Sequence, residues 1–333
     1  MNTKEQLAKL LEQSGDEYLS GERLATQLGL TRAAIWKNIG QLTAEGYEVE
    51  SSRQGYRLGP HSDALSENSI RMNLGDLNPI FELEVLPEID STNNYLRNIA
   101  ITAQHNGTLA DLRPWHAVIT SSQTAGRGRM GRTFVSPPRT GIYLSVLLRP
   151  SFESNLAVRI TTAAAVAAVQ AIEACTEEHP QIKWVNDVYV RNRKVCGILT
   201  EASINYETGV PDWVVLGIGL NVYPPEGGFP AELKDIAGAI TQKRSKNLRS
   251  RITAEFLARF YQICNDLGNS EYSEEYKRRS FLLGQRIDVL KSDGPVPATA
   301  IDIDGECRLV VRYDDQTTEV LSSGEVSVRP AHD

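Results

Sequence analysis

Residues 126–132, GRGRMGR, alternate arginine with glycine, so guanidinium groups and accessible backbone N–H groups occur together in one short loop. This combination suits a phosphate or a carboxylate, because a guanidinium group donates two parallel hydrogen bonds to an oxyanion and bare backbone adds further donors. A flexible, solvated loop without a ligand is the alternative. The loop alone favours neither interpretation.

The three glycines of this loop also have the G-x-G-x-x-G spacing of dinucleotide-binding turns, which lie between a strand and a helix. Residues 116–123 predict the strand, but Pro137 and Pro138 exclude the helix, and residues 142–150 predict a second strand. Protein kinases carry a glycine loop between strands, but their HRD and DFG signatures are absent from this sequence. We therefore set aside both kinds of nucleotide-binding site.

Composition limits the class of protein. The chain has 333 residues, of which 41% are hydrophobic, so it can form two or three domains with cores of their own. Its net charge of -7 argues against a surface that binds nucleic acid non-specifically, so any DNA contact must be local. The four cysteines and five histidines are scattered without ligand spacing, which predicts reduced cysteines and no dedicated transition-metal site.

Two apolar segments bear on localisation. Residues 1–13 predict an amphipathic helix and lack the apolar core of a signal peptide. The longest apolar run, residues 161–175, is short and rich in alanine, which predicts a buried helix and not a membrane span. We therefore expect a cytoplasmic protein without a membrane contact.

Three segments that differ in their predicted helices and strands indicate an α+β multidomain protein. Residues 1–62 contain short helices and a β ribbon, and the small and polar loop GPHSDALSENS follows. Residues 66–272 mix apolar strands with helices, as an α+β catalytic domain does. Residues 275–333 contain short alternating strands, which predict a small barrel or sandwich.

The first segment has the outline of a winged helix-turn-helix. Residues 21–30 predict a helix that ends at Gly29, and residues 47–58 alternate apolar and polar residues around a Gln-Gly turn. The residues predicted to face DNA are the N-cap and first turns of the second helix and two arginines of the wing: Thr31, Arg32, Ala33, Trp36, Lys37, Arg53 and Arg57. A domain that binds protein is the alternative. This segment has few positive charges on its predicted DNA-facing side, so one copy should bind DNA weakly and a dimer is expected.

Four elements of the middle segment occur in a fixed order: EIDSTNNYL, QTAGRGRMGRTFVSPP, KWVNDVYVRNRKVCGILTE and VVLGIGLNV. With the segments on either side, they make the chain resemble, along essentially its whole length, the bifunctional biotin protein ligase and biotin operon repressor family of bacteria. The GRGRxGR loop followed by the KW-ND element is the specific part of the match. The resemblance implies a central ligase domain with a mixed sheet like that of class II aminoacyl-tRNA synthetases and a C-terminal SH3-like β-barrel.

The resemblance also implies a reaction. The family activates biotin with ATP, which arrives with Mg²⁺, to give biotinyl-5′-AMP and pyrophosphate, and then passes biotin to a lysine of the biotin carboxyl carrier protein of acetyl-CoA carboxylase. Biotinyl-AMP promotes a homodimer that binds operator DNA and represses biotin synthesis genes. Because a carboxylate must approach a phosphate, fixed cations and N–H donors have to hold the two anions together.

Site residues are implied position by position. Lys183 and Arg129 match the catalytic positions. The positions that match biotin-binding ones are Ser91, Thr92, Asn93, Gln123, Arg127, Gly128, Arg129 and Lys183. The positions that match nucleotide-binding ones are Arg129, Arg132, Gly217, Gly219 and Asn221. Each set has an ordinary alternative: a solvated lysine, a helix N-cap at Ser91 or Thr92, and an inner strand packed against a helix.

The sequence departs from the family pattern at two places. Thr133-Phe134 stand where Lys-Trp is common, and Val185 stands where proline is common, which should alter loop order and ligand affinity. Three other functions stay open: a ligase for a related acid such as lipoate, a transcription factor that senses a small acid without catalysis, and a ligase whose N-terminal domain no longer regulates. The polar STN and Gln123 set favours the ureido head of biotin over the dithiolane of lipoate.

Overall fold

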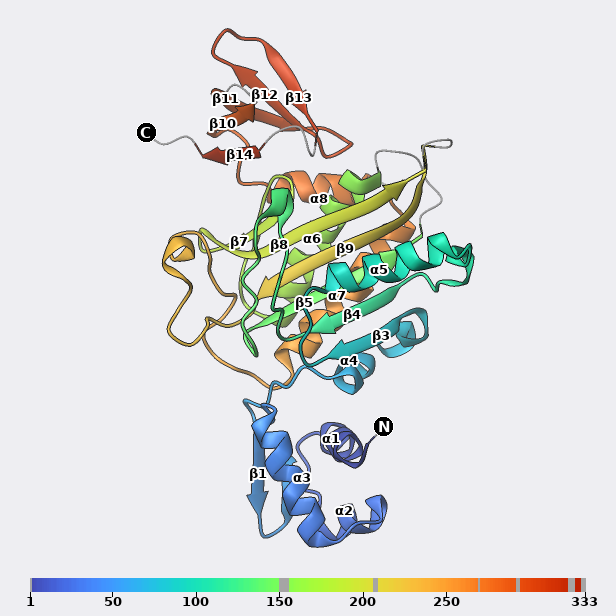
Figure 1. Ribbon diagram of the computed structural model, residues 1–333. Helices are drawn as coiled ribbons and strands as arrows, with labels where there is room; N and C mark the ends of the chain where they lie inside the picture. Colours follow the sequence, from blue (N-terminus) through green and yellow to red (C-terminus); the bar gives the residue numbers. More distant parts are fainter. Residues whose placement is uncertain are drawn as a thin grey trace.

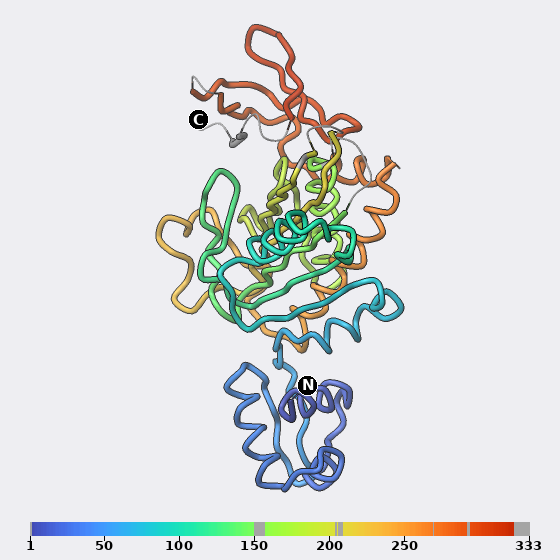
Figure 2. Tube along the Cα trace, turned by 45° about the vertical axis from the view of Figure 1, so that its right-hand side comes forward, coloured from blue at the N-terminus to red at the C-terminus, as the bar shows by residue number. Residues whose placement is uncertain are grey.

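The computed structural model describes residues 2–149, 156–205, 209–268, 270–291, 294–322 and 327–330. Figure 1 shows three bodies along one axis: a small helical unit at the N-terminal end, a large mixed sheet with helices in the middle, and a small antiparallel sheet at the other end. Figure 2 shows that the chain passes once from the N-terminal unit to the rest of the molecule.

The N-terminal unit has the elements that the sequence predicts: α1 (Thr3–Gln13), α2 (Gly21–Leu28), α3 (Arg32–Ala44), β1 (Val49–Ser52) and β2 (Gly55–Leu58). Gly29 ends α2 with a left-handed backbone (φ 64°), which a residue without a Cβ adopts at little cost. The Thr31 side chain accepts a hydrogen bond from the backbone N–H of Ala34 (3.2 Å) and so caps α3. The predicted N-cap and the turn at Gln54 and Gly55 are confirmed.

The central sheet has seven strands in the order β3-β4-β5-β9-β8-β7-β6. In chain order they are β3 (Glu82–Leu86), β4 (His116–Thr120), β5 (Gly141–Leu148), β6 (Gln181–Lys183), β7 (Asp187–Val190), β8 (Arg193–Ile204) and β9 (Pro211–Asn221). Only β3 and β4 run parallel among these neighbours, so the sheet is mixed, as expected. The innermost strands are buried along most of their length, which explains their continuous apolar runs.

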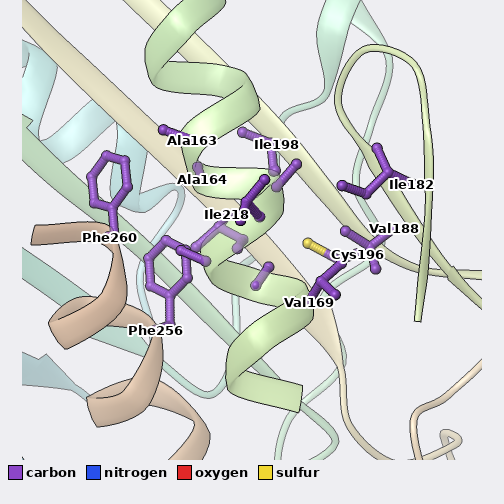
Figure 3. Close-up of a cluster of buried hydrophobic side chains, with 14 of the residues drawn as sticks. Ala163, Ala164, Val169, Ile182, Val188, Cys196, Ile198, Ile218, Phe256 and Phe260 are labelled. Atoms are coloured by element: carbon purple, nitrogen blue, oxygen red, sulfur yellow. The ribbon is translucent and has the colours of Figure 1, made fainter. Parts of the chain in front are cut away.

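Two long helices, α6 (Leu156–Cys175) and α7 (Leu248–Asn265), pack on one face of this sheet, and α5 (Thr92–His105) packs on the other. Figure 3 shows α6 between Phe256 and Phe260 of α7 and the strand residue Ile198. Alanines of α6 allow this close approach. By length and composition α6 could cross a membrane, but 67% of its most apolar window is buried in the protein, which confirms the predicted buried helix.

The sequence interpretation missed two shorter helices, α4 (Glu67–Leu74) and α8 (Glu271–Arg279). In the described part of the chain, four 3₁₀ turns complete the helical elements: η1 (Gly75–Ile80), η2 (Leu109–Asp111), η3 (Arg129–Gly131) and η4 (Ala231–Leu233). Helix α6 begins at Leu156, before the apolar run at residues 161–175 that predicted it.

The C-terminal unit is an antiparallel sheet in the order β13-β12-β11-β10-β14. Its strands are β10 (Arg286–Lys291), β11 (Gly294–Ile303), β12 (Leu309–Tyr313), β13 (Thr318–Leu321) and β14 (Ser327–Pro330). The small all-β unit is confirmed, whereas its closure into an SH3-like barrel stays a prediction. Strand β14 was not anticipated.

A buried ion pair fixes the connection between the N-terminal unit and the central sheet. Asp63 is 1% exposed, and its carboxylate lies 3.1 Å from Nε of Arg249 at the start of α7. The same carboxylate accepts hydrogen bonds from the backbone N–H of Arg249 (2.9 Å) and from the hydroxyl of Tyr223 (2.6 Å). Both oxygens of this carboxylate therefore have partners. Because Tyr223 lies two residues beyond the end of β9, its hydrogen bond to Asp63 joins the connection to the central sheet.

Candidate active site

One cavity of about 310 Å³ lies on the α5 side of the central sheet. It is bounded by the start of α5, the arginine–glycine loop, the turn between β6 and β7, strands β8 and β9, and residues 229–237. All twelve residues predicted to bind biotin or nucleotide line it: Ser91, Thr92, Asn93, Gln123, Arg127, Gly128, Arg129, Arg132, Lys183, Gly217, Gly219 and Asn221. The fold therefore brings together residues from four separate sequence motifs.

The charge of the cavity wall is strongly positive. One acidic residue, Asp187, lines the wall, together with five basic residues: Arg127, Arg129, Arg132, Lys183 and Lys194. This balance favours a ligand that carries several negative charges. Among the described residues, no group of three or more His, Cys, Asp or Glu side chains could hold a metal ion.

Glycines of β9 form part of the cavity floor. A Cβ on Gly217 would lie 1.9 Å from Oδ1 of Asn93, and a Cβ on Gly219 would lie 2.5 Å from the ring of Phe134. The sequence interpretation attributed these glycines to the close approach of an adenylate. In the structure, side chains of the protein itself occupy the space, Asn93 over Gly217 and Phe134 over Gly219. The alternative of an inner strand packed against a helix terminus therefore describes Gly217 well.

Polar groups at the start of α5 form hydrogen bonds with one another and with Gln123. The hydroxyl of Ser91 accepts a hydrogen bond from the backbone of Asn94, so the predicted N-cap is confirmed. Gln123 Oε1 accepts hydrogen bonds from the backbone N–H (3.0 Å) and the hydroxyl (3.3 Å) of Thr92, and its Nε2 donates to Ser136 (2.9 Å). These contacts fix which face of the Gln123 amide meets the cavity.

Glu201 of β8 contacts two of the predicted ligand residues, and sequence reasoning missed it. One of its oxygens lies 2.9 Å from Nη1 of Arg127, and the other accepts a hydrogen bond from Nδ2 of Asn93 (3.0 Å). The Asn93 Oδ1 in turn lies 2.5 Å from the hydroxyl of Ser145. Glu201 thus orients two predicted ligand residues at once. Its signal in the sequence is a lone carboxylate in the apolar strand that contains KVCGILTE.

The arginine–glycine loop is a narrow hairpin without a following helix, as predicted. The backbone N–H of Phe134 donates to the carbonyl of Gly126 (2.9 Å). Met130 (φ 55°) and Gly131 (φ 72°) turn the chain at the tip, where the Met130 side chain is 78% exposed. A Cβ on Gly126 would lie 2.4 Å from the carbonyl oxygen of Phe134, so this glycine is required by the hairpin itself.

The turn between β6 and β7 carries the predicted catalytic lysine. Lys183 is the last residue of β6. Three residues later, the side chain of Asn186 accepts a hydrogen bond from Nη1 of Arg129 (3.0 Å). Asn186 also donates to the carbonyl of Ile198 (2.9 Å), so the turn and the arginine loop are held against β8. The peptide bond between Trp184 and Val185 is cis.

Most of the predicted DNA-facing residues are exposed at one end of α3 and at the wing. Trp36 is 71% exposed, and Arg53 lies at the exposed turn of the ribbon. Arg57 differs, because its Nη2 lies 2.7 Å from Glu50 and its guanidinium group stacks on the ring of Tyr18. Its hydrogen bond holds the pKa of Glu50 below its usual value. Arg57 therefore braces the ribbon in addition to any phosphate contact.

Comparison with known proteins identifies the family. A bifunctional ligase/repressor BirA of Bacillus spizizenii is 33% identical to this chain, and the match covers 96% of this chain and 97% of that protein. The chain belongs to the biotin protein ligase family. The model of the biotin/lipoate A/B protein ligase family matches residues 85–221 of this ligase, a helix-turn-helix domain model matches residues 3–57, and a biotin protein ligase C-terminal domain model matches residues 282–329.

Other relatives agree. The bifunctional ligase/repressor BirA of Escherichia coli strain K12 is 29% identical to this ligase over 95% of this chain. A biotin protein ligase from Aquifex aeolicus, solved in complex with biotin and ATP, superposes with a TM-score of 0.62 at 26% identity and covers 75% of this chain and 99% of that chain. The resemblance predicted from the sequence is confirmed. The chain is an enzyme, so a sensor without catalysis is excluded.

Proposed function

We propose that this ligase joins biotin to ATP in the cavity of the central domain, with Lys183 and Arg129 as its catalytic residues. The observation that carries the proposal is the convergence of all twelve predicted ligand residues on one cavity with five basic side chains. A biotin carboxylate oxygen attacks the α-phosphorus of ATP, the bond to the β-phosphate oxygen breaks, and pyrophosphate leaves. Fixed cations lower the repulsion between the two anions and stabilise the charge of the transition state.

In the second step the amine of a carrier-protein lysine attacks the carbonyl carbon of biotinyl-AMP, the amine loses a proton, and AMP leaves. Lys183 would stabilise the oxygens of the mixed anhydride in both steps. Arg127 and Gly128 would hold the carboxyl end of biotin. The arginine loop would also exclude water, because an acyl phosphate is readily hydrolysed.

The neutral end of biotin would lie at the start of α5. Ser91, Thr92 and Gln123 offer the donors and acceptors that a ureido ring needs. Asn93 is 4% exposed and already bonded at both ends of its amide, so its contribution to biotin binding is to set the shape of this wall. This assignment refines the direct contact expected from the sequence.

The nucleotide would lie beside the arginine–glycine loop and the end of β9. Arg129 and Arg132 would meet the phosphates, and Asn221 at the end of β9 would meet adenine, whereas Asn93 and Phe134 already cover Gly217 and Gly219. Because no acidic cage occurs among the described residues, Mg²⁺ would enter bound to the triphosphate, where it neutralises phosphate charge.

A direct assay tests the activity. The protein is incubated with biotin, Mg²⁺ and ATP labelled at the α-phosphate, and labelled biotinyl-AMP and free pyrophosphate are measured. Addition of the carrier domain of acetyl-CoA carboxylase should then convert the adenylate to AMP and biotinylated carrier. Lipoate serves as the matched acid. Adenylation of lipoate far faster than biotin would overturn the substrate assignment.

The regulatory half of the proposal is a homodimer that binds operator DNA when biotinyl-AMP is present. It is supported by a helix-turn-helix unit whose exposed α3 end has few basic residues, so two copies would be needed. A physical connection runs from Asn221 at the cavity to Tyr223, whose hydroxyl donates to Asp63 in the connection to the DNA-binding unit. We place the protein in the cytoplasm, where its four free cysteines would stay reduced.

Sedimentation and footprinting test this half separately. A non-hydrolysable biotinyl-AMP analogue should strengthen self-association by about 1–3 kcal/mol, as is typical of coupled sites, and raise affinity for DNA upstream of biotin synthesis genes. Identical association and footprints with and without the analogue would leave the enzyme assignment intact and refute the switch.

A further inference from the structure

The strand that presents Lys183 is poorly held by the central sheet. Strand β6 has three residues and is the edge strand after β7 in the strand order. On its outer side it forms a single bridge, between Ile182 and Ser280, where the backbone N–H of Phe281 donates to the carbonyl of Ile182 (3.2 Å). A short edge strand with so few ladder bonds does not by itself fix the direction of its last side chain.

Hydrogen bonds from beyond the sheet hold the residues that follow Lys183. The hydroxyl of Tyr276 in α8 donates to the carbonyl of Val185 (3.0 Å). The indole N–H of Trp184 donates to the carbonyl of Cys307, in the turn between β11 and β12 (2.9 Å). Tyr276 is fully buried and Val185 is 2% exposed, so water does not compete for the first of these bonds.

Burial keeps the first anchor able to donate, and local hydrogen bonds hold the second in place. Burial raises the pKa of Tyr276 well above its usual value, so its hydroxyl stays protonated and able to donate. The turn that presents the Cys307 carbonyl is organised by Asp304, whose carboxylate accepts hydrogen bonds from the backbone N–H groups of Glu306 (3.0 Å) and Arg308 (2.9 Å). The turn after Lys183 is therefore clamped between α8 and the C-terminal sheet.

We propose that Tyr276 is a positioning residue for the ligase reaction, which with the Cys307 turn fixes the backbone that directs Lys183 into the cavity. The same backbone carries Asn186, the hydrogen-bond partner of Arg129, so one anchor serves both catalytic groups. This inference rests on the proposed role of Lys183. Displacement of a catalytic group by about 1 Å typically costs on the order of a hundredfold in rate.

The test compares two buried tyrosines. Tyr276→Phe removes only the hydroxyl that donates to Val185. Tyr47→Phe is the control, because Tyr47 is also buried but its hydroxyl donates to Glu12 in the N-terminal unit (3.1 Å), far along the chain from the turn after Lys183. We expect Tyr276→Phe to lower kcat for adenylate formation by about ten- to a hundredfold with little change in KM for biotin, and Tyr47→Phe to leave both near wild type.

A double variant separates positioning from general destabilisation. If Tyr276 acts through Lys183, Tyr276→Phe should lower the rate by a smaller factor in the Lys183→Ala background, where only its effect through Asn186 and Arg129 is left, than in the wild-type background. An equal fold-loss in both backgrounds, or a wild-type kcat for Tyr276→Phe, would overturn the inference. Wild-type activity of Lys183→Ala alone would instead overturn the proposed role of Lys183.

A second variant keeps the test decisive should Tyr276→Phe not fold. Asp304→Ala loosens the Cys307 turn from a half-buried position far along the chain from the cavity residues. Asp314→Ala is its control, because Asp314 pairs with Arg286 in the same sheet. A lower kcat for Asp304→Ala than for Asp314→Ala supports the inference, and equal values refute it.

Discussion

Removal of the Asp63 carboxylate should destabilise the protein far more than removal of any exposed acid. The Asp63 side chain is 0% exposed and that of its partner Arg249 is 3% exposed. Asp63→Ala would leave the guanidinium group buried without its counter-ion and would take the acceptor from the Tyr223 hydroxyl. Loss of one partner of a buried ion pair costs about 3–5 kcal/mol. This is a large part of the roughly 5–15 kcal/mol by which domains are stable.

Urea denaturation, followed by circular dichroism, measures the change, and Asp235→Ala is the matched control. Asp235 pairs with Arg193 at 3.6 Å, but its side chain is 92% exposed, so its loss should cost less than about 1 kcal/mol. The double variant Asp63→Leu, Arg249→Met should recover much of the loss, because no unpaired charge stays buried. Equal destabilisation by Asp63→Ala and Asp235→Ala would refute the reasoning.

Three further predictions concern the cavity. Lys183→Ala should slow both half-reactions by on the order of a hundredfold or more, because a cation beside developing charge acts mainly in the transition state. The thermal unfolding midpoint should stay unchanged, and wild-type turnover in either step would refute the prediction. Arg129→Gly should raise the dissociation rate of biotinyl-AMP and cause labelling of lysines on unrelated proteins, and an unchanged rate and specificity would count against the loop's role. Gly217→Ala should weaken biotin binding in calorimetry, because its Cβ would meet Asn93 Oδ1 at 1.9 Å, whereas Gly268→Ala, where a Cβ would meet nothing within 4 Å, should not; equal affinities would contradict the wall's importance.

The sequence indicated the candidate site residues better than it indicated the elements that hold them in place. Lys183 and Arg129 were assigned through the family resemblance of their motifs; both line the cavity, and their catalytic roles stay a proposal. Most strands were found because their apolar runs are long and β-branched. Helix α8 was missed because it buries only Tyr272, Ser273 and Tyr276 among charged residues, too few for a clear helical period.

Some contacts were within reach of the sequence and others were not. The Gln-Gly turn at residues 54–55 fixes the ribbon register and so opposes Glu50 to Arg57, which predicts their ion pair. The contact of Glu201 with Asn93 and Arg127 depends instead on how β8 lies beneath the start of α5. That arrangement is set by the whole sheet, and no local pattern encodes it.

These contacts change how substrate selection should be understood. In the folded chain the polar groups that would meet biotin already have protein partners: Gln123 bonds to Thr92 and Ser136, and Arg127 bonds to Glu201. A ligand must therefore offer better partners than the protein does, and not merely fit the space. A carboxylate that displaces Glu201 from Arg127 exchanges one charge-assisted hydrogen bond for another, so this contact adds little net affinity. Discrimination between acids must then come mainly from the head group, because an acid that lacks the ureido donors and acceptors offers these polar groups no better partners than they already have.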